Sequence, residues 1–157
     1  MRIGHGYDAH RFAENRKLVL GGVEIPSPLG LAGHSDADVL VHAVCDSILG
    51  ALSKRDIGYH FPDTDGRYKD IDSLILLGEV KRTMDEEGYT LGNLDCTVIA
   101  QIPKLSPYIE QMRERIASVL CTEKARINVK ATTEEGMGFT GAKEGICAHA
   151  VCILEEK

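Results

Sequence analysis

The stretch Met1–Phe12, MRIGHGYDAHRF, decides how the rest of the chain is interpreted. It predicts a β-strand, and successive side chains of a strand point to opposite faces. Asp8 and His10 therefore share one face, whereas His5 and Tyr7 point to the other. A carboxylate and an imidazole side by side are two ligands of a zinc-type site. Taken alone, the same pair also fits a solvated edge strand.

A helix should follow in the segment HSDADVLVHAVCDSILGAL. Ser35 and Asp38 have the spacing of a variant capping box, which predicts a helix start at Asp36. Apolar side chains surround this helix almost completely, so it should be largely buried.

A polar stripe interrupts this helix at Asp38, His42 and Asp46, spaced i, i+4 and i+8. Ionisable groups on a buried helix need partners or a metal ion. His42 is the expected third ligand beside Asp8 and His10, and three protein ligands leave a fourth position open, as in catalytic zinc sites. Asp38 or Asp46 would then orient His42. A stripe that faces solvent is the alternative.

The remaining pattern alternates strands and helices and predicts one α/β (α+β) domain over residues 1–157. The expected elements are a hairpin over Leu18–Pro26, a long loop over Ser53–Asp70, a helix over Asp72–Glu87 stopped by Gly88, a strand over Tyr89–Ile102, a helix capped by Ser106, and strands over residues 126–133 and 146–154. The last strand is apolar on both faces. Helices can cover one face and a partner subunit the other.

A second polar cluster precedes the glycine-rich turn GMGFTGAKEG. Thr132 and Thr133 can donate hydroxyl and backbone N–H groups to phosphate, and Glu135 offers a hard oxygen ligand suited to Mg²⁺. A simple helix-start cap is the alternative for this cluster. His34 can hydrogen-bond a phosphate oxygen.

The amino-acid composition excludes some classes of function for this protein. The chain is 43% hydrophobic and 27% charged, as in an ordinary globular domain, and its net charge of −6 argues against nucleic acid or an anionic membrane as partner. Five cysteines form no CxxC pair, which indicates reduced thiols. No signal peptide and no membrane-length apolar run is visible, so a cytoplasmic protein is expected. His60 and His149 are expected to take no part in a site.

Six blocks spread over essentially the whole chain carry a resemblance: GHGYDAHRF, AGHSDADVLVHAVCDSILGAL, DIGYHFPDTD, YTLGNLDCTVIAQIPKL, INVKATTEEGMGFTG and EGI. Together they resemble the 2-C-methyl-D-erythritol 2,4-cyclodiphosphate synthase family of the non-mevalonate isoprenoid pathway. The resemblance implies a homotrimer of α/β subunits. Each subunit would have a mixed four-stranded sheet, helices on one face and the other face toward the threefold axis, with active sites between subunits.

The resemblance also implies the reaction. The 2-phosphate of 4-diphosphocytidyl-2-C-methyl-D-erythritol 2-phosphate would attack the β-phosphorus of the same molecule, releasing CMP and the cyclic diphosphate. Zn²⁺ would be held by Asp8, His10 and His42. Mg²⁺ or Mn²⁺ would bridge the substrate diphosphate near Glu135.

By the same resemblance, His34 and Thr133 would meet the charge on the transferring phosphoryl group. The implied substrate-binding residues are Asp8, Ala9, His10, His34, Ser35, Asp56, Ile57, Gly58, Phe61, Pro62, Asp63, Thr64, Asp65, Ala100, Gln101, Ile102, Pro103, Lys104, Leu105, Ser106, Ala131, Thr132, Thr133, Glu134, Glu135 and Phe139.

One position departs from the family. Many members have Arg where this chain has Ala142, followed here by Lys143, and a lysine lacks the planar fork with which arginine holds a diphosphate. This puts in doubt an isoprenoid diphosphate in the cavity on the trimer axis. Two other functions stay open: a trimeric metal- and nucleotide- or isoprenoid-diphosphate-binding protein without turnover, and a zinc phosphoesterase with a linear product.

Overall fold

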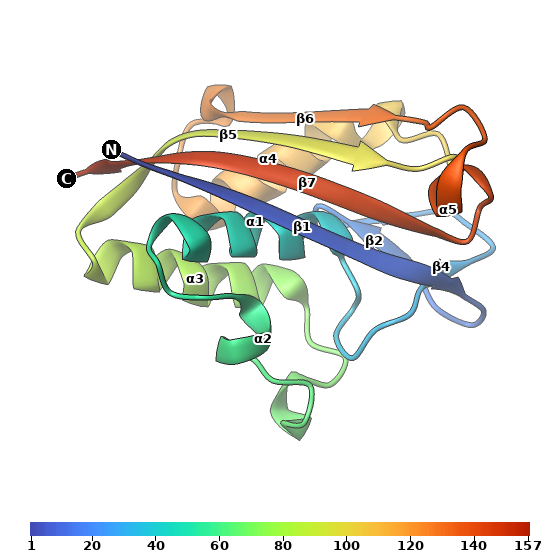
Figure 1. Ribbon diagram of the computed structural model, residues 1–157, viewed down its shortest axis with the longest axis horizontal. Coiled ribbons are helices and arrows are strands. Elements are labelled where there is room, and N and C mark those ends of the chain that lie inside the picture. The colour runs from blue at the N-terminus through green and yellow to red at the C-terminus, as the bar shows by residue number, and fades with distance from the viewer.

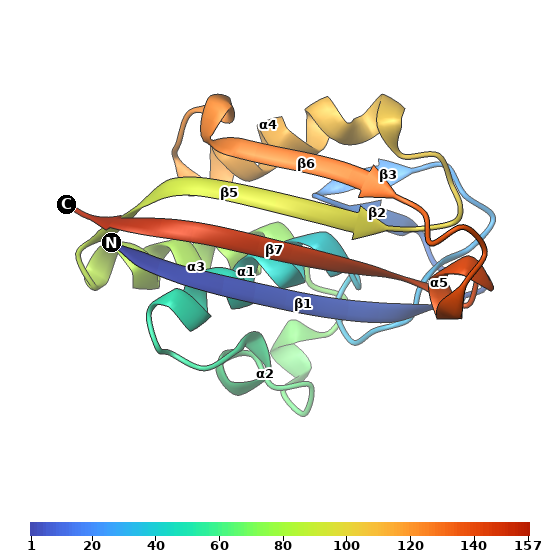
Figure 2. The same ribbon diagram turned by 45° about the horizontal axis from the view of Figure 1, so that its top comes forward.

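Five strands form one mixed sheet in this computed structural model, which describes residues 1–157. In spatial order they are β4 (Gly30–Leu31), β1 (Arg2–Ala13), β7 (Gly145–Glu156), β5 (Tyr89–Ile99) and β6 (Ile127–Thr132) (Figure 1, Figure 2). β1 pairs antiparallel with β4 and β7, β7 pairs antiparallel with β5, and β5 pairs parallel with β6. A separate hairpin consists of β2 (Leu18–Leu20) and β3 (Val23–Ile25).

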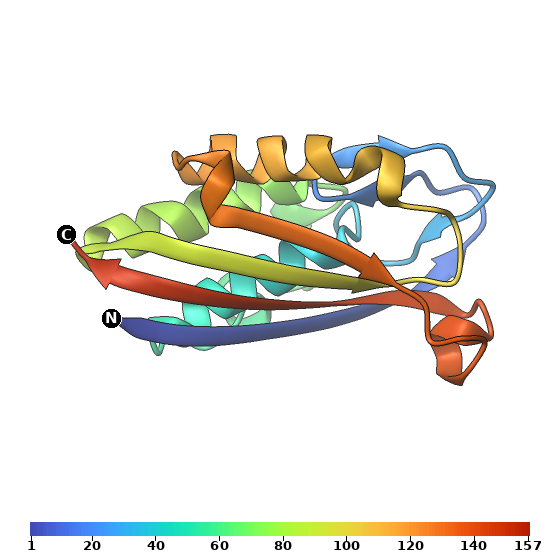
Figure 3. The same cartoon turned by 90° about the horizontal axis from the view of Figure 1, so that it is seen from above.

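The longer helices α1 (Val39–Ala51), α3 (Ser73–Glu86) and α4 (Ile109–Leu120) lie on one side of this sheet, and its other face is not covered by a helix (Figure 3). The shorter helical turns are α2 (Ile57–His60), α5 (Gly138–Gly141), η1 (Gly66–Tyr68), η2 (Ser106–Tyr108) and η3 (Lys124–Arg126). No helix combines the length and the apolar character that crossing a membrane requires.

The predicted fold class is confirmed, with differences in the strand count and in one loop. The sheet has five strands instead of four because two residues, Gly30 and Leu31, pair with the end of β1. The loop over Ser53–Asp70 was expected to lack regular structure, but it contains α2 and η1. Asp56 and Asp65 start these two turns by accepting hydrogen bonds from backbone N–H groups.

Helix starts were predicted with mixed success. Helix α1 begins at Val39 rather than Asp36, because Ala37 adopts a left-handed conformation (φ 56°) and Asp38 is the N-cap, accepting from the backbone N of Val41 at 3.0 Å. Ser106 makes no cap bond, since a 3₁₀ turn precedes α4.

The predictions for α3 are confirmed at both ends. Asp72 is its N-cap, accepting from the backbone N of Leu74 at 2.8 Å. Gly88 follows its last residues with φ 79°, a conformation that ends helices.

The two faces of the sheet differ in what covers them. On β7, alternate residues Ile146, Ala148, Ala150 and Cys152 are buried under the helices. The other face presents apolar side chains to solvent in the single chain, where Ile3 is 68% exposed, Tyr7 46% and Val151 43%. The doubly apolar last strand is thus covered on one side only within one chain.

Candidate active site

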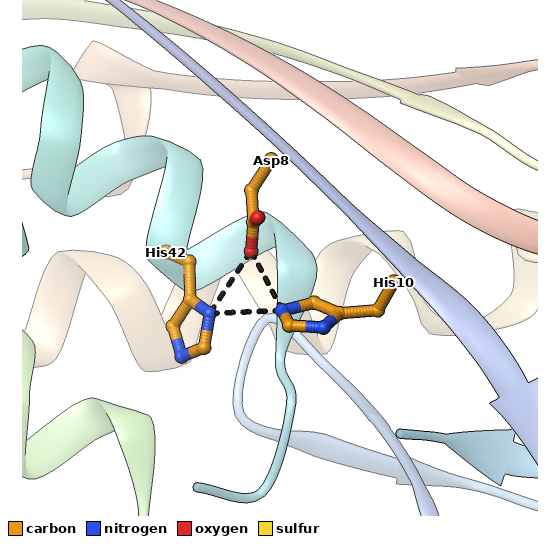
Figure 4. A group of neighbouring side chains, drawn as sticks. All are labelled: Asp8, His10 and His42. Atoms are coloured by element: carbon orange, nitrogen blue, oxygen red, sulfur yellow. Dashed lines mark hydrogen bonds and ion pairs between the residues drawn. The ribbon is translucent and has the colours of Figure 1, made fainter. Parts of the chain in front are cut away.

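Three ligand-type side chains converge where β1 meets α1 (Figure 4). Asp8 Oδ2 lies 2.8 Å from His10 Nε2 and 3.0 Å from His42 Nδ1, and the two imidazole nitrogens are 3.3 Å apart. His42 is 5% exposed, whereas the other two residues are half-buried. The sequence therefore predicted correctly that these three residues come together in space.

Close packing of α1 on β1 produces this arrangement. Gly4 and Gly6 share the face of β1 that carries Asp8 and His10, and they offer no side chain to hold the helix away. A Cβ added to Gly6 would lie 1.9 Å from the carbonyl oxygen of Ala43, the neighbour of His42. The glycines thus allow the helix to bring His42 within contact distance of Asp8.

The donor set fits a zinc ion. One carboxylate oxygen and two imidazole nitrogens lie within 4.8 Å of one another, and these are common ligand types for Zn²⁺. Burial raises the pKa of Asp8, but its hydrogen bonds with His10 and His42 outweigh burial and lower that pKa to about 2. Burial lowers the pKa of His42, and the neighbouring Asp8 carboxylate reverses the shift and raises it. The site thus holds a carboxylate ionised at any physiological pH and favours positive charge beside it.

The low pKa of Asp8 predicts an acid dependence of stability in the metal-free protein. A carboxyl with a folded-state pKa of about 2 and an ordinary value of 3.8 adds stability above pH 4, which is lost as pH falls toward 2. We expect roughly 2 kcal/mol of the unfolding free energy to disappear over that interval through Asp8 alone. Urea unfolding of the metal-free protein and its Asp8→Asn variant, between pH 5 and pH 2, measures this. A difference between the two proteins that does not change with pH would contradict it.

The second nitrogen of His42 has partners that the sequence did not indicate. His42 Nε2 lies 2.9 Å from Ser73 Oγ and 3.1 Å from Ser35 Oγ, and the Ser73 hydroxyl donates to the carboxylate of Asp36. Ser73 lies 31 positions away in the chain, directly after the N-cap of α3, so only its helix-start position was visible in the sequence.

Neither aspartate of the predicted polar stripe hydrogen-bonds His42, so the expectation that Asp38 or Asp46 orients it was wrong. Asp38 accepts from the backbone N–H groups of Gly21 and Gly22 at 2.9 and 2.7 Å and ties the β2–β3 hairpin to α1. Asp46 accepts from the backbone N of Ile57 at 2.8 Å and fixes the start of α2.

A small cavity of about 60 Å³ adjoins the triad. It is lined by His34, Ser35, His42, Ile57, Gly58, Phe61, Asp63, Tyr68 and Leu76. Six of these belong to the substrate-binding set expected beside His42, and Tyr68 and Leu76 line the cavity without belonging to that set.

Other expected residues of this loop lie outside the cavity. Asp56 caps α2 through the backbone N of Tyr59, and Asp65 pairs with Arg67. Pro62 and Thr64 do not line the cavity. His34 Nε2 is 3.2 Å from the carbonyl oxygen of Asp65, which holds the loop against the histidine.

A larger cavity, of about 600 Å³, opens where β5 and β6 end. Its lining is Ala100, Gln101, Ile102, Pro103, Lys104, Leu105, Ser106, Ala131, Thr132, Thr133 and Glu135. All of these residues were expected to bind the nucleotide or its phosphates. Of that expected set, only Glu134 does not line the cavity. The carboxylate of Glu134 accepts from the hydroxyl of Thr140 instead. Glu135 thus lies with the phosphate residues and not with the metal triad.

A third cavity, of about 260 Å³, lies at the end of β1 opposite α5. Phe139 lines it together with Ala9, His10, Arg11, Glu144 and Gly145. His10 is therefore shared between this cavity and the triad. Ala142 and Lys143 lie in the turn between α5 and β7 and line none of the three cavities.

The triad and the large cavity lie on different strands of one chain. β7 and β5 separate β1 from β6 in the sheet, which is about 14 Å at the usual spacing of neighbouring strands. The two cavities share no residue. His34 and Thr133, both expected at the same phosphate, therefore lie in separate cavities.

Comparison with known proteins identifies the family of this chain. The model of the YgbB family matches residues 1–155. This chain belongs to the YgbB family. A curated relative, the 2-C-methyl-D-erythritol 2,4-cyclodiphosphate synthase of Clostridium novyi, is 57% identical over 157 residues, which is the full length of both chains. The YgbB fold recurs in solved structures of similar proteins.

Two of these solved structures are similar to almost the whole of this chain. The bifunctional IspDF of Campylobacter jejuni is 44% identical with a TM-score of 0.96 over 99% of this chain, and this chain spans 42% of that longer protein. The IspF of Plasmodium falciparum, solved as a CDP complex, is 38% identical with a TM-score of 0.87, covering 99% of this chain and 96% of that one. The name 2-C-methyl-D-erythritol 2,4-cyclodiphosphate synthase thus belongs to a relative that matches this chain over its full length.

Proposed function

We propose that this chain is a 2-C-methyl-D-erythritol 2,4-cyclodiphosphate synthase, a phosphorus–oxygen lyase of the non-mevalonate pathway. It converts 4-diphosphocytidyl-2-C-methyl-D-erythritol 2-phosphate to the 2,4-cyclodiphosphate and CMP. The observation that carries the proposal is the pairing of a metal-type triad with a nucleotide-sized cavity on the fold of a family whose full-length relatives bear this name. A cytoplasmic location stays a prediction.

The large cavity is suited to the cytidine end of the substrate. Its volume of about 600 Å³ lies in the range of small-molecule sites, and seven of its eleven lining residues belong to the segment 100–106. Lys104 supplies a positive charge there, in a chain of net charge −6. A similar protein of Plasmodium falciparum, whose structure is described as a CDP complex, supports a cytidine nucleotide as ligand.

The main requirement of this reaction is the correct orientation of the two reacting phosphate groups. Nucleophile and electrophile belong to one molecule, and holding them in line can contribute roughly 7–11 kcal/mol. Thr132 and Thr133 offer hydroxyl and N–H donors to the diphosphate, and His34 faces the opposite phosphate. A Zn²⁺ ion on Asp8, His10 and His42 and a Mg²⁺ or Mn²⁺ ion near Glu135 would neutralise phosphate charge. No protein nucleophile is needed, because a phosphate is already anionic at neutral pH.

The separation of the triad from the large cavity favours a site built from two subunits. The open face of the sheet, with Ile3, Tyr7 and Val151 exposed, offers the contact surface, and we propose a homotrimer with these faces toward the threefold axis. The triad of one subunit would then face the nucleotide cavity of its neighbour. Sedimentation should give three times the 17.1 kDa of one chain.

Complementation tests the shared site directly. Asp8→Asn damages only the triad and Thr133→Ala only the phosphate region, so a mixed trimer of the two variants retains some intact sites between subunits. Co-expression should therefore restore activity above that of either variant alone. If activity stays at the level of the variants although mixed trimers form, the site lies within one chain.

Product analysis tests the reaction and its competitors. The protein is incubated with the diphosphocytidyl substrate and Mg²⁺, and CMP and the second product are followed by chromatography and ³¹P NMR. Equal amounts of CMP and cyclic diphosphate are expected. Binding of the nucleotide without CMP release would instead support a metal- and nucleotide- or isoprenoid-diphosphate-binding protein. A linear product would support a zinc phosphoesterase.

Thr133→Ala should slow turnover without loss of zinc. Thr133 lies in the large cavity, away from the triad. Its hydroxyl donates to Glu135 Oε1 over a long 3.5 Å and would turn to developing phosphate charge when substrate binds. We expect kcat to fall about 100-fold, as when one such donor is removed from other enzymes. Thr133→Ser keeps the hydroxyl and is the matched control. A weakened zinc site in Thr133→Ala, measured by metal analysis, would contradict this role.

A further inference from the structure

The hydrogen bonds around His42 indicate which of its two ring nitrogens carries a proton. A serine hydroxyl has one proton and a carboxylate only accepts. The Ser73 hydroxyl gives its proton to Asp36 Oδ1. The Ser73 oxygen, 2.9 Å from His42 Nε2, can then only accept, so its contact with His42 calls for a proton on Nε2. With Nε2–H as donor, His42 Nδ1 keeps its lone pair.

The lone pair of His42 Nδ1 faces the other two members of the triad, Asp8 and His10. His42 Nδ1 lies 3.0 Å from Asp8 Oδ2 and 3.3 Å from His10 Nε2. Two electron-rich atoms at such a distance repel each other unless a proton or a metal ion lies between them. The neutral ring is thus prepared for a cation on the side of Asp8 and for a hydrogen-bond acceptor on the side of Ser73.

Asp36 is itself held in place as an acceptor. Its Oδ2 accepts from the backbone N of Ser73 at 3.0 Å, and its Oδ1 accepts from the backbone N of Asp38 at 3.1 Å as well as from the Ser73 hydroxyl. These donors belong to the starts of α3 and α1, where N–H groups lack partners within the helix and the helix dipole favours negative charge. The carboxylate therefore connects both helices to His42.

We propose that Ser73 and Asp36 are positioning residues for the metal site: they fix His42 as the Nε2–H tautomer and direct Nδ1 at the ion. This inference rests on the zinc site of the proposed function. Groups that hold the outer nitrogen of a ligand histidine commonly change metal affinity about 10- to 100-fold when removed. Ser35 Oγ, which accepts from the backbone N of Ala37 at 3.2 Å, lies 3.1 Å from the same nitrogen.

The first test reads the tautomer in the zinc-loaded protein, without substrate. Long-range ¹H–¹⁵N NMR of the zinc-loaded protein distinguishes a proton on His42 Nε2 from one on Nδ1. The unmodified protein should show a single Nε2–H tautomer. A proton on Nδ1 would overturn the proposal whatever the reaction proves to be, and the result stands even if no CMP is released in the product assay.

The second test uses variants. Ser73→Ala should lower zinc affinity, measured by competition with a chromophoric chelator, about 10- to 100-fold. Ser73→Thr keeps the hydroxyl and should retain the affinity. Ser47→Ala is the matched control, because Ser47 is also fully buried but its hydroxyl donates to the Val44 carbonyl within α1. Unchanged zinc affinity in Ser73→Ala would refute the proposal.

Discussion

Asp8→Asn is expected to leave the purified protein with almost no zinc and to lower kcat/KM by more than 100-fold. The carboxylate is the only anionic member of the triad, and its Oδ2 contacts both imidazole nitrogens. An asparagine has the same shape but no charge, and its amide either presents N–H groups toward the ion or offers a weaker oxygen ligand. Metal analysis of the purified variant and steady-state kinetics with the diphosphocytidyl substrate measure the two effects.

The fold should survive this substitution, because the core packing lies elsewhere. Circular dichroism and thermal unfolding of the metal-free proteins should therefore be similar at neutral pH within about 2 kcal/mol, the contribution of the Asp8 charge. Glu79→Gln is the matched control: Glu79 is an exposed glutamate on α3 that pairs with Arg82, and a surface pair of this kind contributes little to stability. One zinc per chain in Asp8→Asn would refute the ligand assignment.

Gly6→Ala is expected to destabilise the fold by more than about 4 kcal/mol, a size reserved for severe packing defects. The added methyl would lie 1.9 Å from the carbonyl oxygen of Ala43 and 2.8 Å from the backbone N of Ser47, both of which are backbone atoms of α1. Neither can move without shifting the helix. Chemical unfolding of the metal-free protein measures the loss, and soluble expression falls if the loss exceeds the total stability.

The same substitution should damage the zinc site, because a helix displaced from β1 carries His42 away from Asp8. Gly50→Ala is the control, since Gly50 belongs to the same helix but its added methyl meets only the His5 carbonyl oxygen, at 3.8 Å. Alanine is the better helix former, so this control should be neutral or slightly stabilising. A Gly6→Ala protein with normal stability and normal zinc affinity would show that the close approach is not required.

The parts of the fold that follow from local chemistry were predictable. Alternation along β1 places Asp8 and His10 on one face, and the helical pattern around His42 indicates a buried helix with one polar side chain that needs a partner. The cap at Asp72 and the stop at Gly88 follow from side-chain and backbone preferences alone. In each case the residues that decide the structure are neighbours in the sequence.

The parts that depend on distant contacts were not predictable. Asp38 was read as part of the site, although its carboxylate is fully occupied by the cap of α1 and by the hairpin glycines. Ser73 reaches His42 only because α3 packs beside α1, which no local pattern reveals. The two-residue strand β4 exists because it pairs with the end of β1, and its own sequence is too short to indicate a strand.

The alternation of β1 has a consequence for how this chain can diverge. Its even-numbered residues admit α1 and supply two of the three triad members, and its odd-numbered residues form part of the open face. A single inserted or deleted residue before Asp8 would exchange the two sets, turning Tyr7 or Ala9 inward and the carboxylate outward. Descendants of this gene should therefore accept replacements mainly at the odd-numbered positions of the strand, while its length upstream of the triad stays constant.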